Sequence, residues 1–171
     1  YDGLTIAESK RGPVLNLTRK QVYLALAKQI PDPANPTALI PNPYTTWNQI
    51  DKSLPATKIE VLGPPPTSGT RDSFHELYME AGCRTYPWLN TLRGQDEKRF
   101  KRICHTMRED GGFIEAGEND NLIVQKIEAN KTAVGIFGFS FLEENLDQLR
   151  GSKIDGVEDR KSTRLNSSHR T

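Results

Sequence analysis

The sequence lacks several features that define common classes of protein. No run of residues approaches the roughly 18 apolar residues of a membrane-spanning helix, so we expect no such helix. Only two of the 171 residues are cysteines, which excludes a disulfide-rich miniprotein and a four-cysteine zinc site. The formal net charge is only +1, which excludes a strongly electrostatic nucleic-acid binder. The length then predicts one domain, or at most two small ones.

Both ends of the chain differ from an ordinary protein sequence. The chain begins at Tyr1 without a methionine, and no basic segment followed by an apolar segment marks a signal peptide. Residues 159–171 contain one leucine, no apolar period and a cluster of Arg, Lys and Ser, and they resemble a translated sequencing adapter. A genuine polar tail is the alternative. We predict a folded fragment over 1–158 and a disordered, non-native tail over 159–171.

The predicted elements alternate between strands and helices. Short apolar or alternating runs predict strands at 4–7, 58–63, 112–115 and 132–139. Apolar spacing and capping residues predict helices at 18–29, 68–81 and 96–109, a short helical turn at 47–50, and a helix that begins at 119 or 120. Prolines predict an irregular connector over 31–46. This alternation predicts an α/β fold with helices flanking a sheet, in which ligands bind beyond the carboxyl ends of strands.

Two of the predicted helices have an apolar stripe. In the helix over 68–81, residues at positions i, i+3, i+4 and i+7 form the stripe, and Gly82 is expected to end the helix. These residues are Phe74, Leu77, Tyr78 and Ala81. In the helix over 96–109, the same spacing predicts burial of Phe100, Ile103, Cys104 and Met107.

The strand–turn–helix segment over 58–82 contains the most informative polar residues. Its turn places Ser68, Gly69 and Thr70 at the N-terminus of a helix, where backbone N–H groups have no partner within the helix and the macrodipole is positive. An oxyanion there receives several hydrogen bonds, and Gly69 allows it to approach the backbone closely. Arg71 adds a cation with a planar set of donors. The alternative is that Ser68 or Thr70 only caps the helix.

Other site patterns do not match the sequence. A nucleotide-binding P-loop is excluded because five residues separate Gly63 from Gly69 and Thr70 stands where the lysine is required. A nucleophile elbow is excluded because Pro66 stands two residues before Ser68. His75 and His105 have no partner at the spacing of metal ligands. We therefore predict no catalytic residue, no metal site and no cofactor.

The segment over 66–74, Pro-Thr-Ser-Gly-Thr-Arg-Asp-Ser-Phe, resembles the periplasmic phosphate-binding proteins of bacterial ABC transporters. In that family a Ser-Gly-Thr turn begins a helix and binds phosphate. Five further segments resemble the same family: 2–4, 17–23, 47–50, 117–121 and 133–139. The resemblance spans essentially 1–158 and implies roughly one lobe of a type II periplasmic-binding-protein fold, with helices flanking a mixed sheet.

The resemblance implies a phosphate site in which Ser68, Gly69 and Thr70 donate to phosphate oxygens. Arg71 is the expected cation, because the arginine that the family commonly has four residues before the serine is Pro64 here. The family's other ligands, including the aspartate that accepts the proton of hydrogen phosphate, are expected on a partner lobe that mostly precedes Tyr1. The fragment alone is therefore expected to bind phosphate weakly.

The resemblance also implies the biological setting of the protein. It implies a periplasmic, monomeric substrate-binding component that delivers inorganic phosphate to an ABC-transporter permease, without enzymatic activity. A receptor for sulfate or molybdate, or an enzyme that grips a phosphorylated substrate on the turn over 68–70, is the alternative. A periplasmic location favours a disulfide between Cys83 and Cys104, with two buried free thiols as the alternative.

Overall fold

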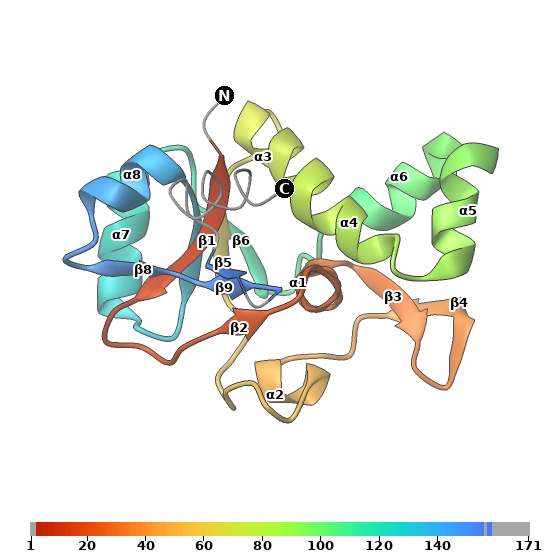
Figure 1. The fold of residues 1–171 in the computed structure, drawn as a ribbon, viewed down its shortest axis with the longest axis horizontal. Coiled ribbons are helices and arrows are strands. Elements are labelled where there is room, and N and C mark those ends of the chain that lie inside the picture. The colour runs from red at the N-terminus through yellow and green to blue at the C-terminus, as the bar shows by residue number, and fades with distance from the viewer. Residues whose placement is uncertain (1–2, 156, 159–171) are drawn as a thin grey trace, which may run out of the picture.

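A mixed five-stranded sheet in the order β6–β5–β7–β1–β8 forms the centre of the fold (Figure 1). The structure, a computed structural model, describes residues 3–155 and 157–158, so the predicted tail over 159–171 lies outside the described residues. Strand β5 is parallel to β6 and β7, whereas β1 is antiparallel to β7 and β8. The strands are β1 (Leu4–Ser9), β5 (Val61–Gly63), β6 (Phe113–Glu115), β7 (Val134–Gly138) and β8 (Leu149–Gly151).

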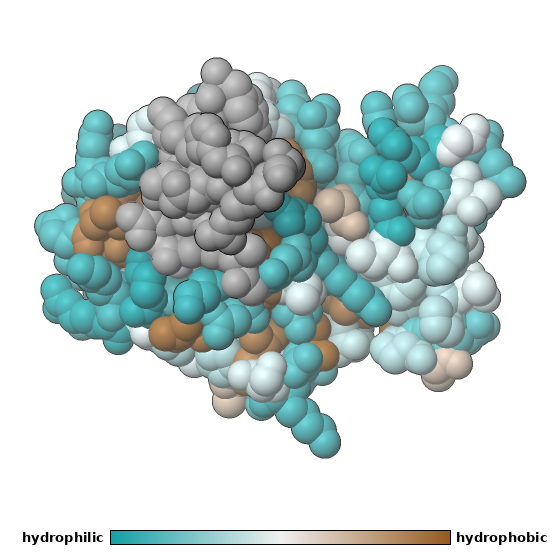
Figure 2. Space-filling model, in the orientation of Figure 1, coloured by the Kyte–Doolittle hydropathy of each residue, from teal (hydrophilic) through white to brown (hydrophobic). Residues whose placement is uncertain are grey.

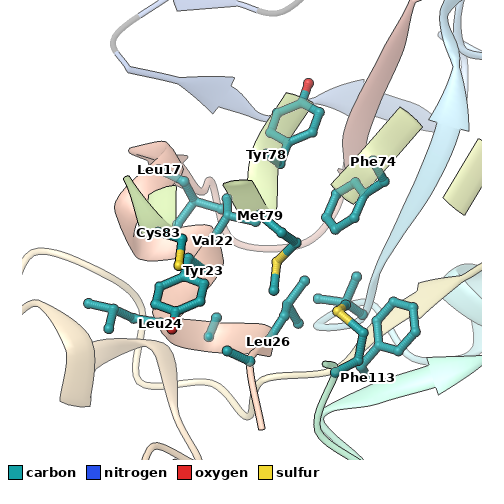
Figure 3. Close-up of a cluster of buried hydrophobic side chains, with 14 of the residues drawn as sticks. Leu17, Val22, Tyr23, Leu24, Leu26, Phe74, Tyr78, Met79, Cys83 and Phe113 are labelled. Atoms are coloured by element: carbon teal, nitrogen blue, oxygen red, sulfur yellow. The ribbon is translucent and has the colours of Figure 1, made fainter. Parts of the chain in front are cut away.

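Helices cover both faces of this sheet. Successive strand residues alternate between two hydrophobic clusters, as Val61 and Leu62 do, because side chains along a strand point to opposite faces. One cluster contains α1 (Arg19–Leu26), whose side chains gather with Phe74, Met79 and Phe113 in Figure 3. The other cluster contains α7 (Asp120–Ala129) and α8 (Phe139–Glu144). The predicted α/β class with helices flanking a mixed sheet is confirmed.

The segment after α1 differs from the prediction. Thr18 caps α1 as expected, but the helix ends at Leu26 instead of Gln29. The residues predicted as an irregular connector instead form a hairpin of β3 (Gln29–Asp32) and β4 (Asn35–Pro41). Prolines are tolerated there because an edge strand needs fewer N–H donors. The indole of Trp88 donates to the Pro36 carbonyl (2.7 Å) and so ties the hairpin to the helical side of the molecule.

The helix after the Ser-Gly-Thr turn contains a π-helical turn that the sequence did not reveal. It comprises α3 (Gly69–Phe74), the π-helix η1 (His75–Met79) and α4 (Glu80–Cys83). The wider turn rotates the later residues, so Leu77 is 36% exposed and Met79 is fully buried. Of the predicted stripe, Phe74 and Tyr78 are buried as expected, whereas Leu77 is exposed and Ala81 is only partly buried. Gly82 does not end the helix: a Cβ there would lie 2.2 Å from the Arg19 carbonyl oxygen, so glycine lets α1 and α4 pack closely.

The remaining elements complete the fold. The predicted helix over 96–109 is α6, which ends at His105, and buried Met107 lies beyond it in a bridge to Ala27. The disulfide between Cys83 and Cys104 joins α4 to α6, with 5.8 Å between their Cα atoms. The other elements are α2 (Trp47–Ile50), α5 (Pro87–Gln95) and a small sheet of β2 (Asn16–Leu17), β9 (Lys153–Ile154) and β10 (Val157–Glu158).

The described surface has few large hydrophobic residues. On the face drawn in Figure 2, hydrophobic residues are scattered among hydrophilic ones. The large hydrophobic side chains that are exposed are Val14, Leu77 and Leu122. Within residues 3–155 and 157–158, no helix combines the length and the apolar character needed to cross a bilayer.

Candidate functional site at the start of α3

Ser68 is the N-cap of α3, in the turn that follows β5. Its Oγ accepts a hydrogen bond from the Thr70 N–H (3.1 Å), and its carbonyl accepts from the Arg71 N–H (3.1 Å). The helix-capping role that the sequence left open is therefore present. It does not consume every donor: the Gly69 N–H has no acceptor among the residues that the structure describes. One backbone donor at the positive end of the helix stays available for a ligand.

A cavity of 180 Å³, which we call the Ser68 cavity, lies beside this turn. Ser68, the N-cap of α3, and Thr70 within α3 line it, together with Gly117 and Glu118 before α7 and Asp120 at the start of α7. Strands β5 and β6 are parallel neighbours, so the segments that follow their carboxyl ends meet at one edge of the sheet. A Cβ built on Gly69 would meet no heavy atom within 4 Å. The turn is therefore open to a small ligand.

The start of α7 contributes the second wall of the Ser68 cavity. Asn119 caps α7, and its Oδ1 accepts from the Leu122 N–H (3.2 Å). Asp120 follows in the first helical turn, and burial raises the pKa of its carboxyl group. The sequence predicted that a helix begins at Asn119 or Asp120, within a segment of the family resemblance, but it did not predict that Asp120 lies beside Ser68. The signal that could have linked them to the site is the repeat of a strand, a turn and a helix N-terminus at 61–70 and again at 113–120.

Arg71, the predicted cation, lies apart from this cavity. Its Nη1 donates to Glu115 Oε1 (3.2 Å) and to the Pro64 carbonyl (3.4 Å), and its guanidinium lies 5.0 Å from the centre of the Phe113 ring. Its side chain is 11% exposed. Arg71 lines a different cavity of 480 Å³, which we call the Arg71 cavity. The structure thus brings Ser68 and Thr70 together with Asp120, and places Arg71 elsewhere.

The two described histidines form a separate cluster. The His75 and His105 rings are stacked, with 4.6 Å between their centroids, and His105 Nε2 lies 2.6 Å from Glu80 Oε2. Burial, together with the charges of His105 and Arg71, lowers the pKa of His75 to about 4. Neither ring lines the Ser68 cavity. Among the described residues, no group of three or more His, Cys, Asp or Glu side chains is placed to hold a metal ion.

Curated proteins similar to this chain include phosphate-binding proteins of bacteria. The chain is 32% identical over 157 residues to the phosphate-binding protein PstS of Staphylococcus haemolyticus and 28% identical over 154 residues to protein SphX of Synechococcus elongatus. Each alignment covers 90% of this chain and 35% of the relative. The chain therefore spans about a third of the length of these curated relatives.

Solved structures show the same fold. PstS from Borrelia burgdorferi superposes with a TM-score of 0.61 at 16% identity, over 98% of this chain and 53% of that chain. An ABC-type phosphate transport receptor from Vibrio cholerae superposes with a TM-score of 0.57 at 20% identity, over 98% of this chain and 52% of that chain. The resemblance seen in the sequence is thus confirmed for the fold, of which this chain forms part.

A domain family gives the broadest match. The family described as the PBP superfamily domain matches residues 1–166, which is nearly the whole chain. Together with the mixed sheet, its flanking helices and the helix N-terminus at Ser68, this match shows that the chain belongs to the PBP superfamily domain family.

Proposed function

We propose that residues 1–158 form roughly one lobe of the substrate-binding component of an ABC transporter, which captures inorganic phosphate in the periplasm. The observation that carries this proposal is the Ser-Gly-Thr turn, which opens a helix onto the Ser68 cavity at the carboxyl ends of β5 and β6. The names of the curated relatives, phosphate-binding protein PstS among them, support phosphate as the ligand. The lobe would act as a monomer and deliver phosphate to a membrane permease.

In this proposal the phosphate oxygens lie at the start of α3. The Gly69 N–H donates directly, and the hydroxyl of Thr70 donates from the cavity wall. Ser68 holds the turn through its bond to the Thr70 N–H, and its hydroxyl hydrogen is available to the ligand. Arg71, the cation that the sequence predicted, does not line this cavity and contributes only through its positive charge. This arrangement is an anion site of the kind that helix N-termini form.

The carboxyl groups of Asp120 and Glu118 favour phosphate as the ligand over an oxyanion that is fully ionised. Both line the Ser68 cavity, and a carboxylate repels an anion unless a proton lies between them. Phosphate keeps one proton near neutral pH and can donate it to a carboxylate, whereas sulfate has none to donate.

We propose a receptor in preference to an enzyme. A general acid or base has to reach the reacting group, and the ring of His75 is buried while that of His105 is paired with Glu80. The similar curated proteins are named as phosphate-binding proteins. A receptor needs only the donors of the turn and an enclosing partner lobe, so a single lobe should bind phosphate weakly.

Replacing Gly69 with alanine is expected to abolish phosphate binding without loss of stability. Beyond the adjoining residues and the backbone of its own helix, the new methyl group would meet no protein atom within 4 Å, so the fold accommodates it. It would nevertheless occupy the space through which the ligand approaches the Gly69 N–H. The measurement is an amide chemical-shift titration of the chain with inorganic phosphate at constant ionic strength, which detects millimolar affinity.

The matched control is Gly94→Ala. Gly94 also lies in a helix, and a Cβ there also meets nothing within 4 Å. In the native chain and in this control, phosphate should shift the amides of Gly69 and Thr70 and should leave the amide of Gly94 unchanged. Phosphate that shifts no amide of the turn, or that binds Gly69→Ala as well as it binds the native chain, would contradict the proposed site.

A further inference from the structure

We propose that the Arg71 cavity is a second ligand site, which binds a small organic acid through the guanidinium of Arg71. The cavity has a volume of 480 Å³ and lies among α3, the end of α6 and β6. None of the residues that line it also lines the Ser68 cavity. It is therefore a separate site, and the proposal does not rest on the phosphate function.

Within the described part of the chain, the hydrogen bonds of the cavity wall leave the Nε of Arg71 as a buried guanidinium nitrogen without a partner. Arg108 also lines the cavity, but its Nε and Nη2 donate to Asp110 (2.7 and 2.8 Å) and its Nη1 donates to the Ala25 carbonyl (2.8 Å). The Nε of Arg71 is buried and has no partner among the described residues. Leaving a buried donor unpaired is costly, so the site favours a ligand that accepts from it.

The bonds that Arg71 does make can yield to a ligand. Its Nη1 is shared between two acceptors at 3.2 and 3.4 Å, and the carboxylate of Glu115 is half exposed. A carboxylate in the cavity could accept from Nε and from a terminal nitrogen of Arg71 together, in the two-pronged geometry that suits a guanidinium. The contact with Phe113 keeps the guanidinium in place while Glu115 moves away.

The other cavity walls define the class of acid. Pro66, Met107 and Phe113 supply apolar surface for a hydrocarbon group. Glu109 and Glu115 also line the cavity and disfavour a second negative charge. A monocarboxylate with an apolar body satisfies both conditions, and benzoate is a suitable probe. Inorganic phosphate, which has no apolar part and carries more charge, should not compete for this site.

The test is a titration of the chain with benzoate, followed through the Nε–H resonance of Arg71. We expect a saturable shift of this resonance and no comparable shift with benzyl alcohol, which lacks the carboxylate. Arg71→Lys keeps the charge but removes the Nε–H, and should weaken benzoate binding roughly tenfold or more. The exposed Arg93 provides the matched control, because Arg93→Lys should bind benzoate as the native chain does.

A second variant decides the matter even if Arg71→Lys fails to fold. Glu115→Gln removes the carboxylate that competes for Arg71, and should strengthen benzoate binding roughly threefold. Equal shifts with benzoate and benzyl alcohol, unchanged binding in Arg71→Lys, or unchanged or weaker binding in Glu115→Gln would each overturn the proposal. Displacement of benzoate by phosphate would overturn the separation of the two sites.

Discussion

Replacing Glu8 with alanine is expected to lower the free energy of unfolding by about 3 kcal/mol, because the substitution removes a buried carboxylate that pairs with the partly exposed Arg150 and accepts hydrogen bonds from its neighbours. Glu8 lies on β1 and is 1% exposed. Its Oε1 accepts from the Leu15 N–H (3.1 Å) and from the Ser152 hydroxyl (2.8 Å), and its Oε2 accepts from Arg150 Nε (2.7 Å). Alanine leaves three donors without their acceptor. Since these donors come from two segments, one at Leu15 and one at Arg150 and Ser152, the loss weakens the attachment of both segments to β1.

Equilibrium denaturation in urea measures this change. Glu8→Gln retains an oxygen acceptor but no charge, so it should lose about 2 kcal/mol, which is the value of hydrogen bonds to a charged group. The exposed Glu143 serves as a control, because a surface substitution such as Glu143→Ala typically changes stability by less than about 0.5 kcal/mol. A Glu8→Ala variant as stable as Glu143→Ala would show that the network contributes nothing.

Acidification from about pH 6.5 to about pH 4 is expected to remove roughly 3 kcal/mol of stability through His75 alone. The pKa of His75 is lowered to about 4 in the folded protein, from an ordinary value of 6.5. Between these two pH values His75 is protonated in the unfolded chain and unprotonated in the folded chain. This contribution is therefore fully present above pH 6.5 and is lost as the pH falls towards 4.

The physical cause of this sensitivity is the surroundings of the ring. His75 is 8% exposed, its Nδ1 has no partner among the described residues, and it faces two groups that disfavour a further positive charge. These are His105, which stacks on it, and Arg71, one helical turn earlier. Glu80 lies nearby but bonds His105. The lowered pKa of Asp110, at about 2, acts below this pH range and does not overlap with it.

The comparison of the native chain with His75→Phe isolates the effect. Phenylalanine preserves the stacked ring and removes an unpaired polar atom, so the variant should be no less stable at pH 7. Unfolding free energies measured from pH 7 to pH 4 should converge or cross in favour of the variant as the pH falls. Parallel profiles for the two proteins would contradict the role of His75.

Local residue patterns predicted much of the fold. Short-range rules predicted the helix caps at Thr18 and Asn119, because a cap bonds only the first turn of its own helix. Short-range patterns also predicted the strands β1, β5, β6 and β7. They did not predict the β3–β4 hairpin or the π-helical turn at His75–Met79. Trp88 bonds the Pro36 carbonyl of the hairpin, and the π-turn packs against α1, and both contacts join parts of the chain that are distant in the sequence.

The sequence by itself determined that a Ser-Gly-Thr turn opens a helix, because capping and glycine geometry are properties of neighbouring residues. Only the tertiary structure decided what surrounds that turn. The parallel pairing of β5 with β6 brought Asp120 to the same cavity, across some fifty residues of chain. Arg71 contacts Glu115 and Phe113 on β6, and its side chain therefore lines a different cavity. Such contacts depend on strand order, which local sequence patterns do not encode.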